Sequence, residues 1–109
     1  MANTFKLKTK ANVGVTTVGI STAPAATTTV VIGITMANTS GSGVNVGVGI
    51  TRAGTTEDVK LLKNAPIPQG SSLEFMAGNK IVLEATDTVT VDSDTNNSVD
   101  AALTIMEIT

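Results

Sequence analysis

This chain of 109 residues is long enough for one domain with a single hydrophobic core. Its net charge of −2 argues against nucleic-acid binding, and the absence of cysteine and histidine excludes disulfides, thiolate metal sites and the usual general base. Aromatic residues account for only 2% of the chain, so aliphatic side chains must form the core. The N-terminus lacks a signal-peptide pattern and the apolar runs are short, which predicts cytoplasmic synthesis and no membrane span.

Alternation of apolar and polar residues with a period of two starts near the N-terminus and predicts extended strands. Phe5 and Leu7 alternate with Lys6 and Lys8, which predicts a half-buried first strand. Residues 1–12 are therefore expected to form an N-terminal arm or an edge strand.

The next segments predict a long central hairpin. An extended stretch over residues 13–20 ends before Pro24, which cannot donate to a strand ladder. Residues 27–36 are apolar on both faces, which indicates a central strand, and one of these faces holds Val30, Ile32, Ile34 and Met36. A turn over residues 37–43 leads to a partner strand over residues 44–51, in which one face holds Val44, Val46, Val48 and Ile50.

Short strands separated by polar turns are predicted for the second half of the chain. A proline-rich corner spans residues 65–70, a turn spans residues 77–79, and a polar loop spans residues 92–98. The strands expected around them cover residues 58–63, 72–75, 80–83, 88–91 and 99–105.

These segments together predict an all-β fold of about eight or nine short strands. No domain boundary or repeat is visible, so we expect residues 1–109 to form a single-domain antiparallel β-sandwich. Jelly-roll and immunoglobulin-like topologies both remain open. The predicted core consists of Val30, Ile32, Ile34, Val46, Val48, Leu83, Val91, Leu103 and Ile105.

One cluster of oxygen-bearing side chains is a candidate metal site. Asp92, Asp94, Asn96 and the nearby Asp100 offer the oxygen ligands that Ca²⁺ prefers, at a spacing similar to the start of a calcium loop. The sixth position is Asn97 instead of glycine, and the twelfth is Leu103 instead of glutamate. We therefore favour a polar hairpin loop whose side chains bond their own backbone, and we expect no metal requirement.

Catalysis has few candidate residues. Glu74 with Glu84 is a formal carboxylate pair for glycoside hydrolysis, but sugar sites usually have aromatic platforms, and this chain has two phenylalanines in all. No glycine-rich phosphate loop precedes a helix, and no nucleophile has a base beside it. We expect a non-enzymatic protein with no cofactor, no small-molecule substrate, and no nucleic-acid or membrane partner.

The charges are distributed unevenly. Lys6, Lys8 and Lys10 lie at a spacing of two, whereas every charge from Glu84 onward is negative. The simpler interpretation is a solvated strand face that protects a sheet edge. Alternatively, the lysines form an interface with the acidic C-terminal stretch of a neighbouring copy.

Several segments carry a family resemblance. The run from Ala65 to Glu74, Ala-Pro-Ile-Pro-Gln-Gly-Ser-Ser-Leu-Glu, precedes Gly-Asn-Lys-Ile-Val-Leu-Glu-Ala from Gly78 and then Asp87. This pattern resembles the connection between two sandwich strands in small virion proteins of tailed bacteriophages. The ending from Val99 to Ile108 is similar to their last strand, and the segment from Val18 to Ile34 also fits their pattern.

The resemblance implies a structural component of a virion, made in the host cytoplasm. A capsid decoration protein bound to the major capsid protein is the first choice, because the chain is short and shows no extra docking module. A core with few aromatics and several exposed strand edges favours self-association, expected as a homotrimer. The alternatives are a tail, neck or baseplate protein, or a fibre-associated module that binds a receptor or carbohydrate.

Overall fold

The computed structural model describes residues 3–54, 57–75 and 80–109. These residues form nine strands and no helix, so no described helix is long and apolar enough to span a membrane. The expected turn at residues 77–79, which includes part of the resemblance motif, lies outside the described residues. The strands are β1 (Asn3–Val13), β2 (Val18–Thr22), β3 (Thr28–Asn38), β4 (Val44–Arg52), β5 (Glu57–Ile67), β6 (Ser72–Phe75), β7 (Ile81–Leu83), β8 (Thr88–Ser93) and β9 (Val99–Ile108).

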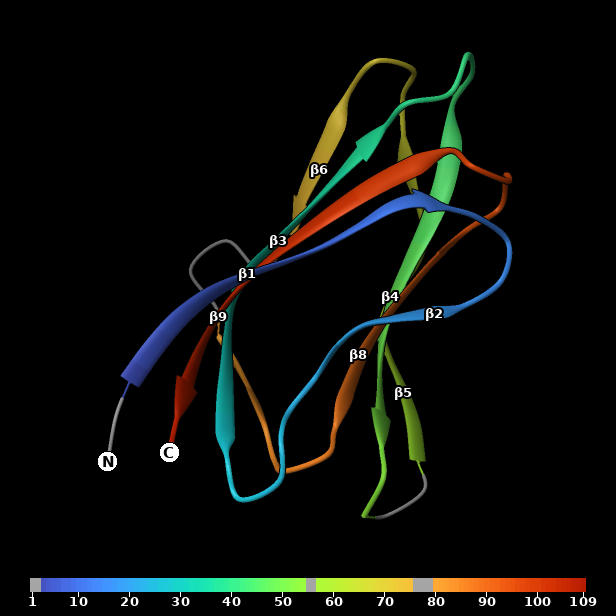
Figure 1. Cartoon of the computed structure of the whole chain (residues 1–109). Helices are drawn as coiled ribbons and strands as arrows, with labels where there is room; N and C mark the ends of the chain where they lie inside the picture. The colour runs from blue at the N-terminus through green and yellow to red at the C-terminus, as the bar shows by residue number, and fades with distance from the viewer. Residues whose placement is uncertain (1–2, 55–56, 76–79) are drawn as a thin grey trace.

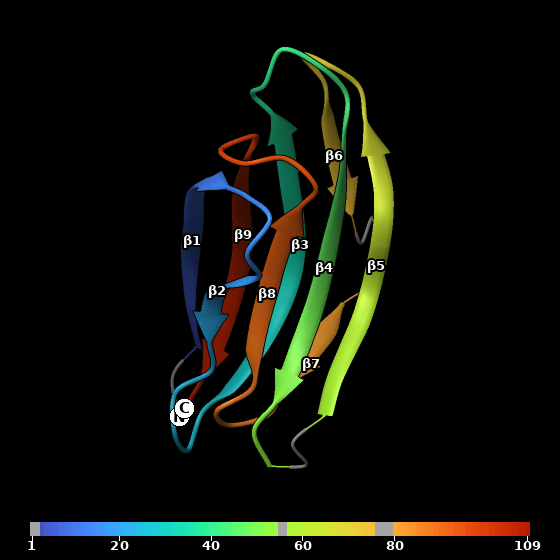
Figure 2. The ribbon, with the colours of Figure 1, turned by 90° about the vertical axis from the view of Figure 1, so that its right-hand side faces the viewer.

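The strands form two antiparallel sheets that pack face to face (Figures 1 and 2). One sheet has the order β1-β9-β3-β6, with β7 also paired to β3, and the other has the order β2-β8-β4-β5. This arrangement confirms the predicted all-β fold and the antiparallel β-sandwich.

The strand pairing decides the topology that the sequence left open. The predicted hairpin of residues 27–36 with residues 44–51 is wrong, because β3 and β4 lie in different sheets and do not pair. β1 pairs with β9, β2 with β8, and β4 with β5. β6 pairs with residues 34–37 of β3 and β7 pairs with residues 29–31, so these two short strands together occupy one strand position. The eight resulting positions pair as first with last, second with second-last and so on, like a long hairpin wound into two sheets. This is the jelly-roll topology.

The core lies between the sheets and is aliphatic, as the composition requires. On β9, every second side chain from Val99 to Ile105 is buried, and the same alternation holds on β4 from Val44 to Ile50. Seven of the predicted core residues are buried: Ile34, Val46, Val48, Leu83, Val91, Leu103 and Ile105.

The prediction for Val30 and Ile32 is wrong, because β3 contains a β-bulge. Val31 lies beside Ile105 and Gly33 lies beside Thr104, so Ile32 is an extra residue in the ladder. An extra residue reverses which side chains face the core. Before the bulge, the core-facing residues are therefore Thr29 and Val31; after it, they are Ile34 and Met36.

The predicted burial of Phe5 and Leu7 is also wrong. Their exposed fractions are 69% and 65%, and β1 lies at the edge of its sheet. Lys6 lies beside Ile105 and Lys8 lies beside Leu103 on β9, so the lysines occupy the core-facing side of β1. The opposite sheet ends at β2, which has five residues against eleven in β1. The lysines can therefore reach solvent, while Phe5 and Leu7 point out of the sandwich.

Candidate functional site

The loop between β8 and β9 does not gather its acidic side chains around one point. The Asp92 carboxylate accepts a hydrogen bond from the Thr17 hydroxyl at 2.9 Å, and the Asp94 carboxylate accepts one from the Asn45 backbone N–H at 3.1 Å. The remaining two candidates also accept hydrogen bonds from backbone N–H groups. Asn96 Oδ1 accepts one from Val15 at 3.5 Å, and Asp100 Oδ1 accepts one from Asn12 at 3.0 Å.

These hydrogen bonds give the loop a structural role. It fastens the β1–β2 connection and the start of β4 to the end of the sandwich. Within the described ranges, no three acidic, histidine or cysteine side chains are grouped so that they could hold a metal ion. Each of the four candidate ligands accepts a hydrogen bond from a different residue, so they do not form one metal site.

Glu74 and Glu84, the candidate carboxylate pair for glycoside hydrolysis, do not lie close together either. Glu74 on β6 lies beside Thr35, whereas Glu84 follows Leu83, which lies beside Thr29. Six residues of β3 separate these positions, or about 20 Å along a strand. Glycosidase carboxylates lie roughly 5–9.5 Å apart, so Glu74 and Glu84 cannot act together.

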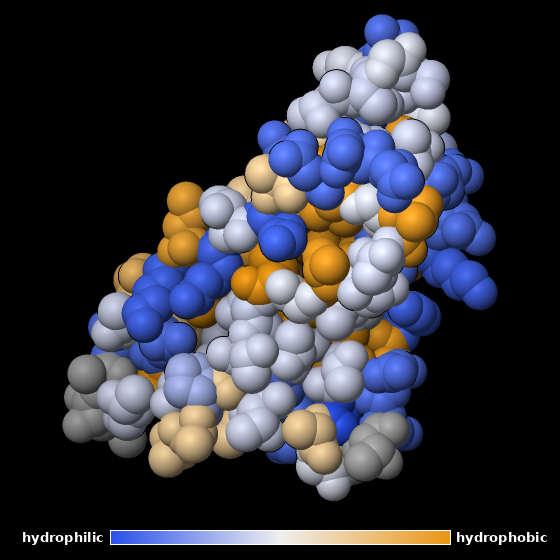
Figure 3. Space-filling model, turned by 45° about the vertical axis from the view of Figure 1, so that its right-hand side comes forward, coloured by the Kyte–Doolittle hydropathy of each residue, from blue (hydrophilic) through white to orange (hydrophobic). Residues whose placement is uncertain are grey.

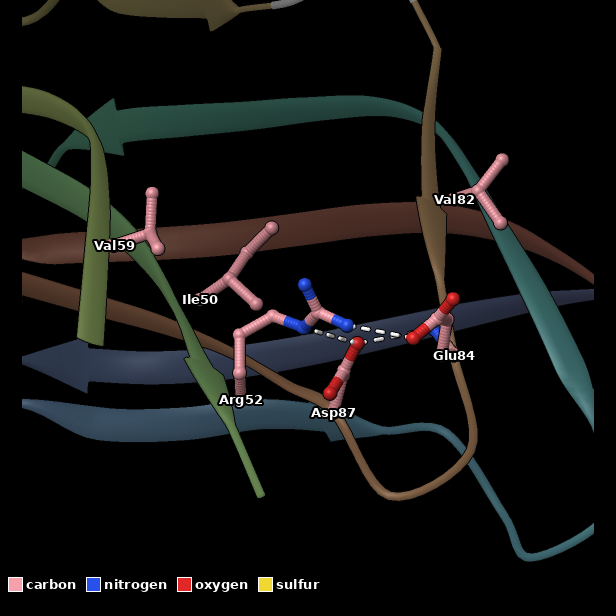
Figure 4. Close-up of a pocket in the computed structure, with 6 residues that line it drawn as sticks. All are labelled: Ile50, Arg52, Val59, Val82, Glu84 and Asp87. Carbon is pink, nitrogen blue, oxygen red and sulfur yellow. Dashed lines mark hydrogen bonds and ion pairs between the residues drawn. The ribbon is translucent and has the colours of Figure 1, made fainter. Parts of the chain in front are cut away.

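Glu84 belongs instead to an ionic cluster at the β7–β8 turn (Figure 4). Arg52 Nη2, at the end of β4, lies 2.6 Å from Glu84 Oε1, and Arg52 Nε lies 3.0 Å from Asp87 Oδ2. The second contact is an ion pair without hydrogen-bond alignment. Asp87 is buried and also accepts the Glu84 backbone N–H at 3.0 Å. The cluster therefore ties the β7–β8 turn to β4.

A shallow pocket of about 290 Å³ lies beside this cluster. Three aliphatic side chains, Ile50, Val59 and Val82, line it together with the cluster (Figure 4). The Arg52 guanidinium points toward the two carboxylates and forms an ion pair with each of them. Glu84 and Asp87 are the carboxylates that line the pocket, and both pair with Arg52.

The lysine stripe on β1, formed by Lys6, Lys8 and Lys10, is only partly available to a partner. Lys6 Nζ lies 2.9 Å from Glu107 Oε1 of the same chain, and the Glu107 side chain is only 10% exposed. Among the described residues, Lys8 and Lys10 have no carboxylate within ion-pair distance. Inward-pointing lysines on an edge strand hinder pairing with another strand. The role of the stripe as an interface between copies remains a prediction.

A further surface was missed by sequence reasoning. We define the outer face as the outward-facing side chains of β1, β9, β3 and β7. Phe5, Met106, Val30 and Val82 lie in register across these four strands. Phe5, Leu7 and Val82, at 59–69% exposure, are three of the five large hydrophobic side chains that are exposed in the described structure.

The outer face is predominantly uncharged. Among its described positions only Asp100, at one end of β9, bears a charge, and Glu74 on the adjoining β6 faces the same way beside Thr35. In the space-filling view, hydrophilic side chains form a broken diagonal band, with hydrophobic surface on both sides of it (Figure 3). A signal for this face exists in the sequence: residues 102–108 of the last strand alternate Ala, Thr, Met and Ile on the side away from the core.

Comparisons with known proteins identify the fold. No protein-family model matches the chain, and no curated protein matches its sequence. A chain of the acid-stable capsid of Helicobacter pylori bacteriophage KHP30 matches with a TM-score of 0.58 and 10% identity, over 98% of this chain and 87% of that one. A chain of the cyanophage Pam1 capsid matches with a TM-score of 0.56 and 16% identity, over 95% and 85%.

A chain of the disulfide-linked pili that form Bacillus endospore appendages matches similarly. Its TM-score is 0.57 at 15% identity, over 99% of this chain and 87% of that one. At such low identities the likeness establishes a shared β-sandwich fold. Both viral and pilus assemblies use this fold.

Proposed function

We propose that this chain is a structural component of a tailed-phage virion, a capsid decoration protein that binds the major capsid protein on the shell and reinforces it. The observation that carries this role is the match of nearly the whole chain to 85–87% of two phage capsid chains. Jelly rolls are common in viral capsid domains. The resemblance of residues 65–87 to small virion proteins supports the same role.

The chemistry of the side chains supports a non-enzymatic role. In the described part of the chain, Asp92, Asp94 and Asp100 hold loops, and Asp87 and Glu84 hold Arg52. Enzymes need groups that converge on one reacting atom with perturbed acidity, and these groups are already used for structure. The exposed apolar side chains of the outer face suit contacts with other proteins.

The alternatives have less support. A pilus role matches the fold equally well, but the matched pili are disulfide-linked and these 109 residues contain no cysteine. A carbohydrate-binding module would need a concave site with aromatic side chains, and the ionic pocket has none. A tail, neck or baseplate position fits the same fold, so the position in the particle has to be measured.

Heating tests the reinforcing role. Particles assembled with and without this protein would be heated in parallel while genome release is followed with a DNA-binding dye. We expect particles without the protein to release DNA at a lower temperature, and adding the purified protein back to restore the original temperature. Equal release temperatures would reject reinforcement and would move a tail, neck or baseplate role to first place. The homotrimer expected from the sequence remains a prediction.

A further inference from the structure

The first strand, β1, is attached to the sandwich with little burial. We define the arm as residues 3–10 of β1. Seven of these eight residues are exposed and Lys8 is half-buried, so the arm buries little apolar surface. Among the described strands it pairs with β9 alone, at the edge of the sheet (Figure 2). The arm is therefore held mainly by its backbone ladder to β9 and by the ion pair between Lys6 and Glu107.

A hinge separates the arm from the body of the domain. The register of β1 with β9 shifts between Lys10 and Val13, which marks a β-bulge at residues 11 and 12. Asn12 has a φ of 59°, in the left-handed region. Directly after the bulge the chain is anchored, since Val13 is only 1% exposed and its carbonyl oxygen accepts the Ser98 N–H at 3.0 Å. The change of direction between arm and body is thus confined to two residues.

The surroundings of the hinge leave room for its dihedral angles to change. Two surface hollows, of about 390 Å³ and about 350 Å³, border it, and both are lined by Lys10 and Ala11. The Asn12 backbone N–H donates a hydrogen bond to Asp100 Oδ1 at 3.0 Å, at an exposed position. Water can replace this bond when the hinge opens, and opening leaves the core between the sheets intact.

An empty place beside β9 would be unfavourable. Without the arm, β9 presents an edge of unpaired backbone N–H and C=O groups. Glu107, whose side chain is only 10% exposed, loses the Lys6 ammonium that compensates its charge. An opened molecule therefore needs another strand that carries a lysine at the same register. The arm of a second copy meets both needs, because it repeats every contact that the chain's own arm makes.

We propose that the arm is exchanged reciprocally between two copies of this chain. The hinge at residues 11 and 12 opens, each arm pairs with β9 of the other copy, and Lys6 of each copy pairs with Glu107 of the other. Exchange of identical elements is a low-cost route to a dimer, because it needs no new interface. The arms of the two copies compete for the same places, so exchange increases with protein concentration. The exchange goes beyond the proposed role in the virion and requires no shell protein.

Introduced cysteines test the exchange, since these 109 residues contain none. Leu7 and Thr104 lie opposite each other on β1 and β9, with Cα atoms about 4.5–5.5 Å apart, a distance that a disulfide can span. Purified Leu7→Cys and Thr104→Cys would be mixed and oxidised, and mass spectrometry without reduction would quantify the heterodimer and both homodimers. Exchange should raise the heterodimer severalfold above the statistical proportion that random collisions give.

A cysteine pair on inner strands is the matched control. Thr35 of β3 lies opposite Ala102 of β9, and β3 is an inner strand that cannot leave β9 unless the domain unfolds. A mixture of Thr35→Cys and Ala102→Cys should therefore give only the statistical proportion. Placing both cysteines of a pair in one chain would verify that each pair can form its disulfide. A heterodimer of Leu7→Cys with Thr104→Cys that does not exceed the control would overturn the proposal.

Substitutions at Asn12 test the hinge. Proline fixes φ near −65°, so Asn12→Pro should disfavour the closed hinge and raise the mass in sedimentation velocity from 11.0 kDa to twice that value. Asn12→Gly adopts a positive φ readily and should stay mainly monomeric. Circular dichroism would verify folding, and the cysteine experiment decides the matter if Asn12→Pro does not fold. A folded Asn12→Pro that stays monomeric, or equal dimerisation of Asn12→Gly, would contradict the exchange.

Discussion

Two glycines on β4 allow its neighbours to approach closely. A Cβ added at Gly49 would lie 2.8 Å from the Val59 carbonyl oxygen, a backbone atom of β5 that cannot swing away. At Gly47 the nearest atom would be Asp92 Oδ1 at 2.5 Å, which belongs to a side chain. The space beside these two glycines is therefore filled by the β5 backbone and by Asp92.

Replacing Gly49 should destabilise the domain. We expect Gly49→Ala to lower the free energy of unfolding by about 1–3 kcal/mol, because the backbone of β5 must shift. Gly33→Ala is the matched control, since a Cβ there meets nothing within 4 Å. Urea unfolding at low protein concentration would compare the two, and equal midpoints would contradict the close packing at Gly49.

Thr86 occupies a strained backbone conformation in the β7–β8 turn. Its φ of 71° is in the left-handed region, which a β-branched residue adopts at a cost. Thr86→Gly should therefore raise stability by about 0.5–1 kcal/mol. Thr16→Gly, in a loop without positive φ, should lower stability through the entropy of the unfolded chain. A loss of stability in both variants on thermal unfolding would contradict the strain.

At the scale of elements, Asp87 holds the β7–β8 turn to β4. Asp87→Asn keeps the shape but removes the charge that faces Arg52 in a buried position, so we expect a loss of about 1–3 kcal/mol. Glu84→Gln removes the other partner of Arg52, but the Glu84 side chain is 75% exposed, so the loss should be below about 1 kcal/mol. Calorimetry would separate the two variants, and an equal or larger effect of Glu84→Gln would show that the buried ion pair is not the important contact.

Alternation predicts the core correctly where a strand keeps its period. β8 and β9 have unbroken alternation, and the predicted core residues on β4, β8 and β9 are all buried: Val46, Val48, Val91, Leu103 and Ile105. Val44, Ile50, Val89, Val99 and Ala101 on the same strands are also buried but were not in the predicted core. β3 fails at Ile32 because a bulge inserts one residue, and local hydrophobicity contains no information about that insertion. β1 fails because an edge strand extends beyond the opposite sheet, so its apolar residues are free to face outward.

At the scale of the whole molecule, the sandwich followed from the sequence but the jelly roll did not. Pairing of β1 with β9 joins the two ends of the chain, and no short-range pattern encodes such a contact. The candidate loop at residues 92–98 was identified as polar, but its use as a fastener depends on Thr17 and Asn45, which are distant in sequence. The outer face was missed for a similar reason, since its row of apolar residues exists only once four strands are in register.

The position of the protein in the particle tests its proposed function most directly. Cryo-electron microscopy of purified virions, with the chain quantified by mass spectrometry against the major capsid protein, would provide both position and copy number. We predict density for this jelly roll on the capsid surface at many repeated positions, with hundreds of copies in each particle. Density confined to the tail, neck or baseplate, with a few dozen copies or fewer, would contradict a capsid decoration protein.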